Sequence, residues 1–182
     1  MMIRKTTEKD IERLMDIYAH ARKFMAEHGN PNQWGKRNWP PKALIEADIK
    51  NGCSYVCENE QGVVVGTFFF SQGENIEPTY MNIDDGEWIG DNHYGVVHRI
   101  ASDSSEKGIG SFCIRWALEQ CGHLRIDTHG DNKVMQGMLA KLGFTHCGTI
   151  YVYEDNDPRL AYEKIVDSFD LSKDSEFLAR YG

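Results

Sequence analysis

Two glycines, one residue apart, stand at the point where a strand-like run gives way to an amphipathic helix. Residues 94–101 (YGVVHRIA) have the β-branched and aromatic content of a strand, and residues 108–121 carry apolar side chains at helical spacing. The segment 105–111 (SEKGIGS) leads into the helical run and overlaps its first residues. Glycine allows positive φ and close approach of a ligand, and a helix N-terminus offers unpaired N–H groups. The segment therefore predicts a phosphate-binding turn or a helix start that merely needs glycine, and the glycines alone favour the second.

Two well-known phosphate-binding motifs do not match this turn. A P-loop requires glycine, four residues and then Gly-Lys-Ser/Thr, whereas Gly110 is followed by Ser111 and Phe112. A dinucleotide-binding turn requires a third glycine where Cys113 stands, and it follows the first strand of its domain. Both motifs are excluded, and the turn needs another explanation.

The order of predicted elements indicates an α/β fold with a mixed sheet. Hairpins alternate with strand–helix–strand crossings, which is typical of a single layered domain. Residues 73–92 are polar and give no clear assignment. The predicted elements are a strand at 2–6, a helix from 11 to about 28, a helix from 42 to 50, strands at 53–58 and 63–70, a strand at 94–101, a helix at 108–121, a strand at 124–128, a helix at 133–142, and strands at 149–153 and 160–165.

Composition and charge narrow the classes of function. The chain has 182 residues, 41% of them hydrophobic, and a formal net charge of -8. That charge argues against nucleic-acid binding and agrees better with a small cationic partner, although acidity also serves solubility. We find no signal peptide and no apolar run near the about 20 residues that span a membrane. Five cysteines without a Cys-x-x-Cys spacing predict free thiols and no metal site, so we expect a cytoplasmic protein.

The glycine turn resembles the acyl-CoA signature of the GCN5-related N-acetyltransferase (GNAT) superfamily. That signature reads Gln/Arg-x-x-Gly-x-Gly/Ala between the fourth strand and the third helix, and Ser105, Gly108 and Gly110 occupy its marked positions. Downstream, Asn132 opens the next helix and residues 141–144 (KLGF) end it, as in this family. The motif is weak alone, and it becomes specific when strand, spacing, asparagine and KLGF occur in order.

The resemblance covers residues 3–166, nearly the whole chain. It implies a single GNAT-like domain over residues 1–166, with a mixed, mostly antiparallel sheet, about four flanking helices and splayed central strands. Residues 167–182 then form an acidic C-terminal tail. The sequence leaves open whether this tail packs back as a short helix or reaches a second subunit in a homodimer.

The resemblance also implies how acetyl-CoA is bound. The acyl donor lies between the fourth and fifth strands, where the backbone of Arg99, Ile100 and Ala101 pairs with the pantetheine arm and polarises the thioester. Asn132 contacts the CoA arm or orders the next helix. The main-chain amides expected to hold the pyrophosphate are those of Ser105, Glu106, Lys107, Gly108, Ile109, Gly110 and Ser111.

The chain departs from the family pattern at two positions. Ser105 replaces the usual Gln/Arg and is shorter and uncharged, so either Lys107 compensates or the backbone suffices. Many members carry a helix tyrosine that protonates the leaving thiolate, and the matching position here is Leu139. The resemblance thus implies another acid, a water molecule or no acid at this step.

Candidates for proton transfer and acceptor binding come from residue type and position. His129 follows the predicted fifth strand, and imidazole suits a general base near neutrality, although an exposed turn histidine fits equally well. Trp34 and Trp39 flank prolines after the first helix, where they either line the acceptor pocket or simply pack the loop.

Together these features predict an N-acetyltransferase. It would transfer acetyl from acetyl-CoA to a primary amine, on a small molecule or a protein N-terminus, by direct attack in a ternary complex. The alternative is a non-catalytic acyl-CoA-binding sensor on the same fold, which the serine and leucine at positions 105 and 139 keep open.

Overall fold

The computed structural model describes residues 1–153 and 156–166. The first three strands of its sheet pair in antiparallel fashion. β1 (Met2–Lys5) pairs with β2 (Ser54–Glu58), and β2 pairs with β3 (Val64–Glu74). The remaining strands are β4 (His93–Ser102), β5 (His123–His129), β6 (Thr145–Tyr151) and β7 (Pro158–Ile165). The α-helices of the described residues are α1 (Ile11–Glu27), α2 (Lys42–Lys50), α3 (Ile109–Cys121) and α4 (Lys133–Lys141).

The strands form one mixed sheet in the order β1-β2-β3-β4-β5-β7-β6. β5 pairs antiparallel with β7, and β7 pairs antiparallel with β6. β4 runs parallel to β5, and the parallel pairing joins Gly95 to Leu124 and Val96 to Arg125. The predicted fold class, a single α/β domain with a mixed and mostly antiparallel sheet and four helices, is confirmed.

The first of two structural units comprises Met1–Phe70 and His98–Cys113. Its core forms because α1 presents apolar side chains every three or four residues, which places them on one helix face. Burying each such side chain contributes about 1.5–3 kcal/mol. The buried cluster consists of Leu14, Ile17, Tyr18 and Ala21 of α1, Ile45 of α2, Val56 and Val64 of the hairpin, Ala101 of β4, and Trp34.

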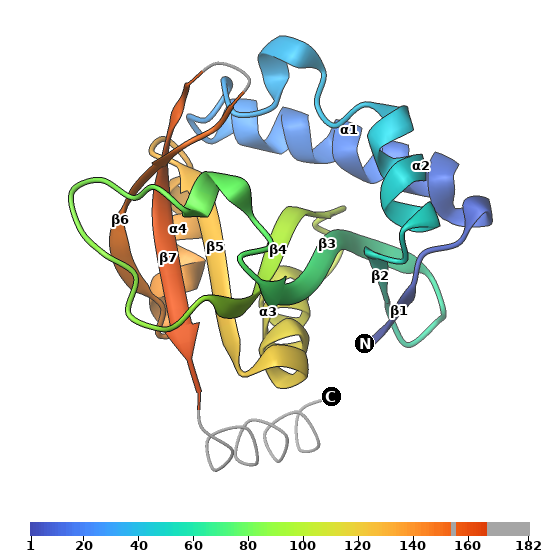
Figure 1. The fold of residues 1–182 in the computed structure, drawn as a ribbon. Coiled ribbons are helices and arrows are strands. Elements are labelled where there is room, and N and C mark those ends of the chain that lie inside the picture. Colours follow the sequence, from blue (N-terminus) through green and yellow to red (C-terminus); the bar gives the residue numbers. More distant parts are fainter. Residues whose placement is uncertain (154–155, 167–182) are drawn as a thin grey trace. The chain divides into compact units, whose positions relative to one another are not determined.

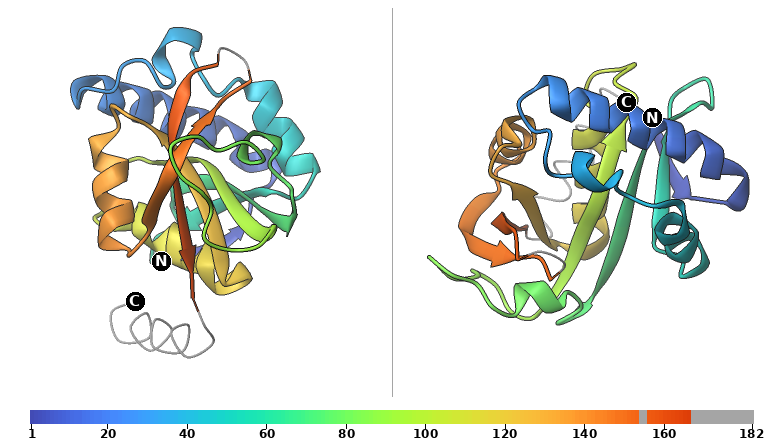
Figure 2. Two further views of the ribbon diagram at one scale, coloured as in Figure 1. Left: turned by 60° about the vertical axis from the view of Figure 1, so that its left-hand side comes forward. Right: turned by 90° about the horizontal axis from the view of Figure 1, so that it is seen from above.

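The second unit comprises Ser71–Val97 and Ile114–Gly182. In Figure 1 and the left view of Figure 2, α4 lies beside the strands β5, β7 and β6. A long loop from residue 81 to 92 crosses in front of β6 and β7 in Figure 1. It pairs with β6 through Asp84 and Thr149, and at Gly86 it approaches so closely that a Cβ would lie 1.9 Å from the Cys147 carbonyl oxygen. Glycine is therefore required where this loop meets the strand.

Several predicted boundaries differ from the observed ones. β6 begins at Thr145, four residues before the predicted start at 149, because it follows α4 after the short Leu142–Phe144 connection. β3 continues to Glu74, into the segment that gave no assignment. The predicted acidic tail, residues 167–182, lies outside the described residues. Among the helices of residues 1–153 and 156–166, none combines the length and apolar character needed to cross a bilayer.

Candidate active site

The glycine turn connects β4 to α3 within the first unit. Residues 104–108 of the turn are exposed, whereas Ile109, the first residue of α3, is buried. Gly108 has a φ of +85°, and no atom lies within 4 Å of the place where a Cβ would stand. The first helical hydrogen bond is donated by the Phe112 amide to the Gly108 carbonyl at 2.9 Å. The earliest amides of α3 have no intrahelical acceptor, so they are directed toward the exposed turn.

Ile109 is a site residue only through its backbone, because its side chain packs inward. A Cβ on Gly66 of β3 would lie 2.6 Å from Cγ2 of Ile109. Glycine at position 66 therefore lets the start of α3 pack closely against β3. This contact anchors the helix N-terminus directly after the exposed turn.

Asp103 organises the head of the turn. Its Oδ1 accepts hydrogen bonds from the Ser105 amide at 2.9 Å and from the Ser105 hydroxyl at 2.6 Å, and its own amide donates to Val65 O at 2.9 Å. Partial burial raises the pKa of Asp103, but the Ser105 bonds and the Arg13 guanidinium outweigh burial and lower the pKa overall. Both polar donors of Ser105 are thus engaged inside the turn.

The two predicted pyrophosphate-binding residues that follow Ser105 both reach solvent. Glu106 and Lys107 are exposed, and Oε1 of Glu106 accepts a hydrogen bond from the side-chain amide of Asn59 at 2.9 Å. Asn59 belongs to the β2–β3 hairpin turn, where its Oδ1 accepts from the Val63 amide at 3.0 Å. The exposed turn is thereby connected to the hairpin.

Arg99 interrupts β4 where the resemblance places the pantetheine arm. Its φ of +52° is unusual for a residue other than glycine. The Tyr18 hydroxyl donates to the Arg99 carbonyl at 2.9 Å, and the guanidinium binds Asp48 at 2.8 and 2.9 Å while stacking 4.7 Å from the Phe69 ring centroid. Of the two residues that follow, Ile100 is half-buried and Ala101 is buried. Tyr18 therefore holds the irregular backbone, while Asp48 and Phe69 hold the Arg99 side chain.

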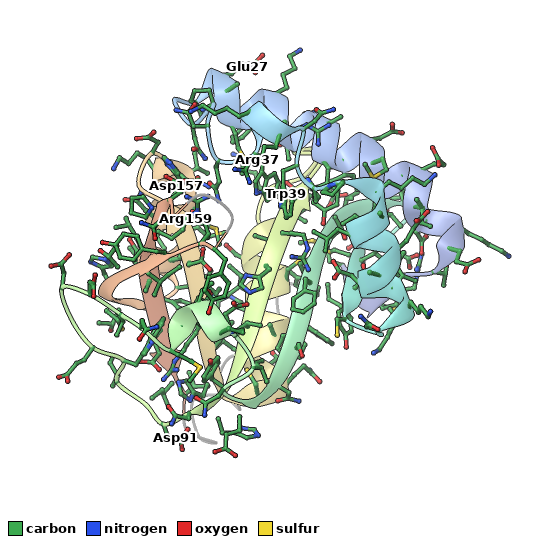
Figure 3. The ribbon with its side chains drawn as sticks, turned by 45° about the horizontal axis from the view of Figure 1, so that its top comes forward. Glu27, Arg37, Trp39, Asp91, Asp157 and Arg159 are labelled. Carbon is green, nitrogen blue, oxygen red and sulfur yellow. The ribbon has the colours of Figure 1, made fainter. Side chains whose placement is uncertain are left out.

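His129 closes β5 in the second unit. Its Nδ1 accepts the Asp131 amide at 3.0 Å, and its Nε2 lies 3.6 Å from Oδ2 of Asp157. Asp157 also forms an ion pair with Arg159, and Figure 3 shows these two side chains together at the start of β7. An Nδ1 that accepts this bond carries no proton, so the neutral ring holds its proton on Nε2, the nitrogen nearer to Asp157.

Asn132 and Leu139 take structural positions on α4. Asn132 is the N-cap, and its Oδ1 accepts the Met135 amide at 3.0 Å, which agrees with the predicted ordering of the helix start. Leu139 is fully buried and packs in the core. A buried leucine offers no proton for the leaving thiolate.

The two tryptophans predicted for the acceptor pocket lie in the loop between α1 and α2. Trp34 is 8% exposed and packs edge-on against Tyr18, with ring centroids 5.8 Å apart. Trp39, labelled in Figure 3, is half-buried against the same core, and its carbonyl accepts a hydrogen bond from Arg22 at 3.1 Å. Trp34 therefore serves the core, while Trp39 retains exposed surface.

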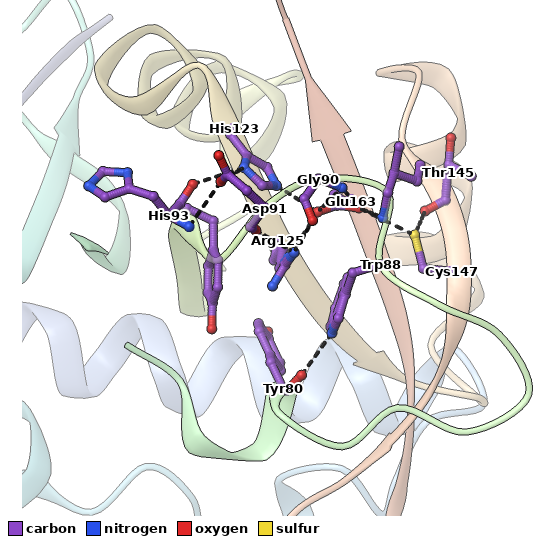
Figure 4. A network of polar contacts seen from close by, with 12 residues as sticks. Tyr80, Trp88, Gly90, Asp91, His93, His123, Arg125, Thr145, Cys147 and Glu163 are labelled. Atoms are coloured by element: carbon purple, nitrogen blue, oxygen red, sulfur yellow. Dashed lines mark hydrogen bonds and ion pairs between the residues drawn. The ribbon is translucent and has the colours of Figure 1, made fainter. Parts of the chain in front are cut away.

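Sequence reasoning missed a buried ionic network in the second unit (Figure 4). The fully buried carboxylate of Glu163 accepts hydrogen bonds from His123 Nε2 at 2.6 Å, from Arg125 Nε at 2.8 Å and from the Ile89 amide at 2.5 Å. Burial raises the pKa of Glu163, but these donors prevail and lower it to about 2. Opposite charges at Arg125 and Glu163, which are register partners on β5 and β7, are the signal that could have revealed the network.

Arg125 connects that network to the long loop. Its guanidinium lies 4.4 Å from the Trp88 ring centroid and 4.1 Å from that of Tyr94, and it donates to the carbonyls of Gly90 and Asp91. Cation–π contacts of this kind strengthen when they are desolvated. The network therefore fixes residues 88–91 directly before β4.

The thiols of the chain are unbridged. All five cysteines are free, and Cys57, Cys113 and Cys147 are buried. Within residues 1–153 and 156–166, no group of three or more His, Cys, Asp or Glu side chains is placed to hold a metal ion.

Comparison with known proteins shows that this chain is similar in sequence and fold to acetyltransferases. Residues 11–144 match the model of the acetyltransferase (GNAT) family. A solved GNAT-family acetyltransferase from Streptococcus agalactiae is 31% identical, with a TM-score of 0.82 over 92% of this chain and 96% of that chain. A search of curated proteins finds no significant match.

Two more distant structures share the fold. A ribosomal-protein-alanine N-acetyltransferase from Brucella melitensis is 20% identical, with a TM-score of 0.57 over 91% of this chain and 100% of that chain. A phosphinothricin acetyltransferase from Sinorhizobium meliloti, solved in complex with acetyl-CoA, is 14% identical, with a TM-score of 0.58 over 91% and 88%.

Proposed function

This chain belongs to the acetyltransferase (GNAT) family, and we propose that it transfers the acetyl group of acetyl-CoA to a primary amine. The amine is carried by a small molecule or by a protein N-terminus. The names of the two distant neighbours give different acceptors, a ribosomal-protein alanine and phosphinothricin, so the fold alone does not identify the acceptor. The net charge of -8 favours a cationic amine.

The observation that carries this proposal is the exposed turn at the N-terminus of α3. Gly108 adopts a φ of +85° beside open space, and the first amides of the helix that follows have no intrahelical acceptor and lie at the positive end of its dipole. We assign the amides from Glu106 to Ser111 to the CoA pyrophosphate, and we assign Ser105 to shaping the turn through Asp103. The bound acetyl-CoA of the Sinorhizobium meliloti neighbour supports the choice of cofactor.

The proposed chemistry is a direct attack in a ternary complex. The neutral amine nitrogen forms a bond to the thioester carbonyl carbon, the carbon–sulfur bond breaks, and the CoA thiolate takes up a proton. Backbone of Arg99, Ile100 and Ala101 pairs with the pantetheine arm and stabilises the oxyanion. His129 accepts the amine proton at Nδ1, which gives up its hydrogen bond from the Asp131 amide, and Trp39 lines the acceptor pocket. Holding both reactants in place supplies much of the rate.

The test is release of CoA thiol from acetyl-CoA with a panel of primary amines. We expect at least one amine to release thiol, and Gly108→Ala to raise KM for acetyl-CoA severalfold, because alanine at positive φ is strained by about 1 kcal/mol. The matched control is Gly29→Ala, since Gly29 has a φ of +82° and is equally open. The control variant suffers the same strain and should keep its KM. Equal KM changes in both variants would count against the turn as the CoA site.

The fully buried Leu139 favours one alternative, a non-catalytic acyl-CoA sensor, because it removes the tyrosine that many members use as an acid. Acetyl-CoA would then raise the melting temperature, as a ligand that binds only the folded state does. No amine would release thiol. If acetyl-CoA leaves the melting temperature unchanged, both functions are wrong.

A further inference from the structure

We infer that Arg13 and Asp103 are positioning residues. They hold the turn that we assign to the CoA pyrophosphate in its binding conformation, and so they replace the long side chain that Ser105 lacks. The inference rests on the proposed function, because it concerns how this chain binds acetyl-CoA. It assigns a role to an α1 residue far from the glycine turn in sequence. All of the groups involved lie in the first unit.

Arg13 bridges two strands with one guanidinium. Its Nη2 binds Oδ2 of Asp103 at 2.5 Å, and its Nε donates to the Val64 carbonyl at 2.9 Å. The amide of Asp103 in turn donates to the Val65 carbonyl at 2.9 Å. A planar guanidinium can make both contacts in a fixed geometry, which the point charge of a lysine cannot reproduce. Arg13 therefore fixes the end of β4 against β3.

Asp103 connects Arg13 to the turn, because its carboxylate binds both Arg13 and Ser105. One carboxylate oxygen faces Arg13, and the other accepts both the amide and the hydroxyl of Ser105. Ser104, between them, has a φ of +60°, and its hydroxyl lies 3.1 Å from His20 Nε2. The unusual backbone conformation at Ser104 is held from both sides by these contacts. The amides that follow Ser105 thus have a defined direction before any ligand arrives.

The positive charge of Arg13 also reduces the repulsion between the Asp103 carboxylate and a bound pyrophosphate. A carboxylate at the entrance of a pyrophosphate site repels the ligand, and the side-chain exposure of Asp103 is only 16%, so solvent screens it incompletely. The Arg13 guanidinium neutralises that charge at 2.5 Å. The pair keeps the hydrogen-bonding ability of a carboxylate while reducing its repulsion. Removing Arg13 alone therefore harms pyrophosphate binding more than removing the pair.

The test compares acetyl-CoA with acetyl-pantetheine, which lacks the pyrophosphate. We expect Arg13→Gln to raise KM for acetyl-CoA about tenfold with kcat nearly unchanged, the effect of lost charge-assisted positioning. Its kcat/KM for acetyl-pantetheine should match that of the unmodified protein, which a general structural defect would not allow. Asp103→Asn keeps an acceptor for Ser105 and removes the repulsive charge, so combining it with Arg13→Gln should restore part of the affinity.

The matched control lies one residue away on α1. Glu12 forms an exposed ion pair with Lys42 at 2.9 Å, so Glu12→Gln removes an ion pair of the same helix without touching the turn. That variant should keep both KM values. Ser105→Ala removes only the hydrogen bond from the Ser105 hydroxyl to Asp103, so it should raise KM for acetyl-CoA by a smaller factor than Arg13→Gln does. If Arg13→Gln does not fold, Ser105→Ala is the variant that tests the inference.

The outcomes separate the inference from the proposed function. If the unmodified protein neither binds acetyl-CoA nor releases thiol, the proposed function fails. If it is active but Arg13→Gln or Ser105→Ala binds acetyl-CoA as tightly as the Glu12→Gln control, the function stands and the inference is overturned. Equal losses with acetyl-CoA and acetyl-pantetheine would also overturn it, because the defect would not involve the pyrophosphate.

Discussion

Glu163 shows how one residue can set the stability of a large loop. A fully buried carboxylate is tolerated only when it is paired, and here Arg125, His123 and two backbone amides surround it. His123 places Nε2 on this carboxylate at 2.6 Å and Nδ1 on the His93 carbonyl at 2.9 Å. Both ring nitrogens therefore lie within hydrogen-bond distance of acceptors. The network couples β5 and β7 to residues 88–91.

Lowering the pH should weaken the protein through Glu163. Its pKa is lowered from 4.5 to about 2, so its contribution to stability is complete above pH 4.5 and is lost as the pH falls toward 2. Glu163→Gln should unfold more easily at pH 7 by about 3–5 kcal/mol, as expected when one partner of a buried pair is removed. Its stability should also decline less steeply between pH 4.5 and 2. Denaturant unfolding across this pH range measures both effects.

The control for this prediction lies in the same loop. Glu87 is exposed, so Glu87→Gln removes one negative charge without touching the network. Its free energy of unfolding should stay within about 0.5 kcal/mol of the unmodified value. A Glu163→Gln protein that is as stable as this control would contradict the assigned role.

At the scale of elements, the sequence predicted which helices and strands exist better than where they lie. Amphipathic spacing predicted α1, and the strand before the glycine turn was predicted to within one residue at either end. The insertion of β7 between β5 and β6 was not predictable, because a hairpin pattern does not show which of its strands faces the rest of the sheet. The ion pair between Arg13 and Asp103 was also not predicted from the sequence, since a carboxylate in a turn usually remains solvated.

Asn132 at the start of α4 allows a structural role to be separated from a binding role. Asn132→Ala should cost about 1 kcal/mol, because the Met135 amide loses its cap. Asn132→Asp keeps a capping oxygen and should retain the stability of the unmodified protein, but its charge should weaken acetyl-CoA binding if residue 132 contacts the CoA arm. Thermal unfolding and acetyl-CoA titration of both variants measure these effects. Unchanged affinity in Asn132→Asp would limit residue 132 to capping.

At the scale of the whole molecule, membership of the GNAT family rests on more than the glycine turn. The family match extends from α1 through α4, and the 31% identical neighbour covers 92% of the chain. The order of elements and the KLGF segment predicted this family from sequence, while the acceptor and the proton-transfer groups did not follow from it. The acceptor depends on loop side chains such as Trp39, whose positions the pattern does not determine.

The central claim is that the turn after β4 binds the pyrophosphate of acetyl-CoA. The most direct measurement follows backbone amide signals by NMR while acetyl-CoA or acetyl-pantetheine is added. We predict that acetyl-CoA shifts the amides from Glu106 to Ser111, and that acetyl-pantetheine leaves them in place while it shifts those of Ile100 and Ala101. If saturating acetyl-CoA leaves the amides of the turn unmoved, the turn is not the pyrophosphate site and the account is contradicted.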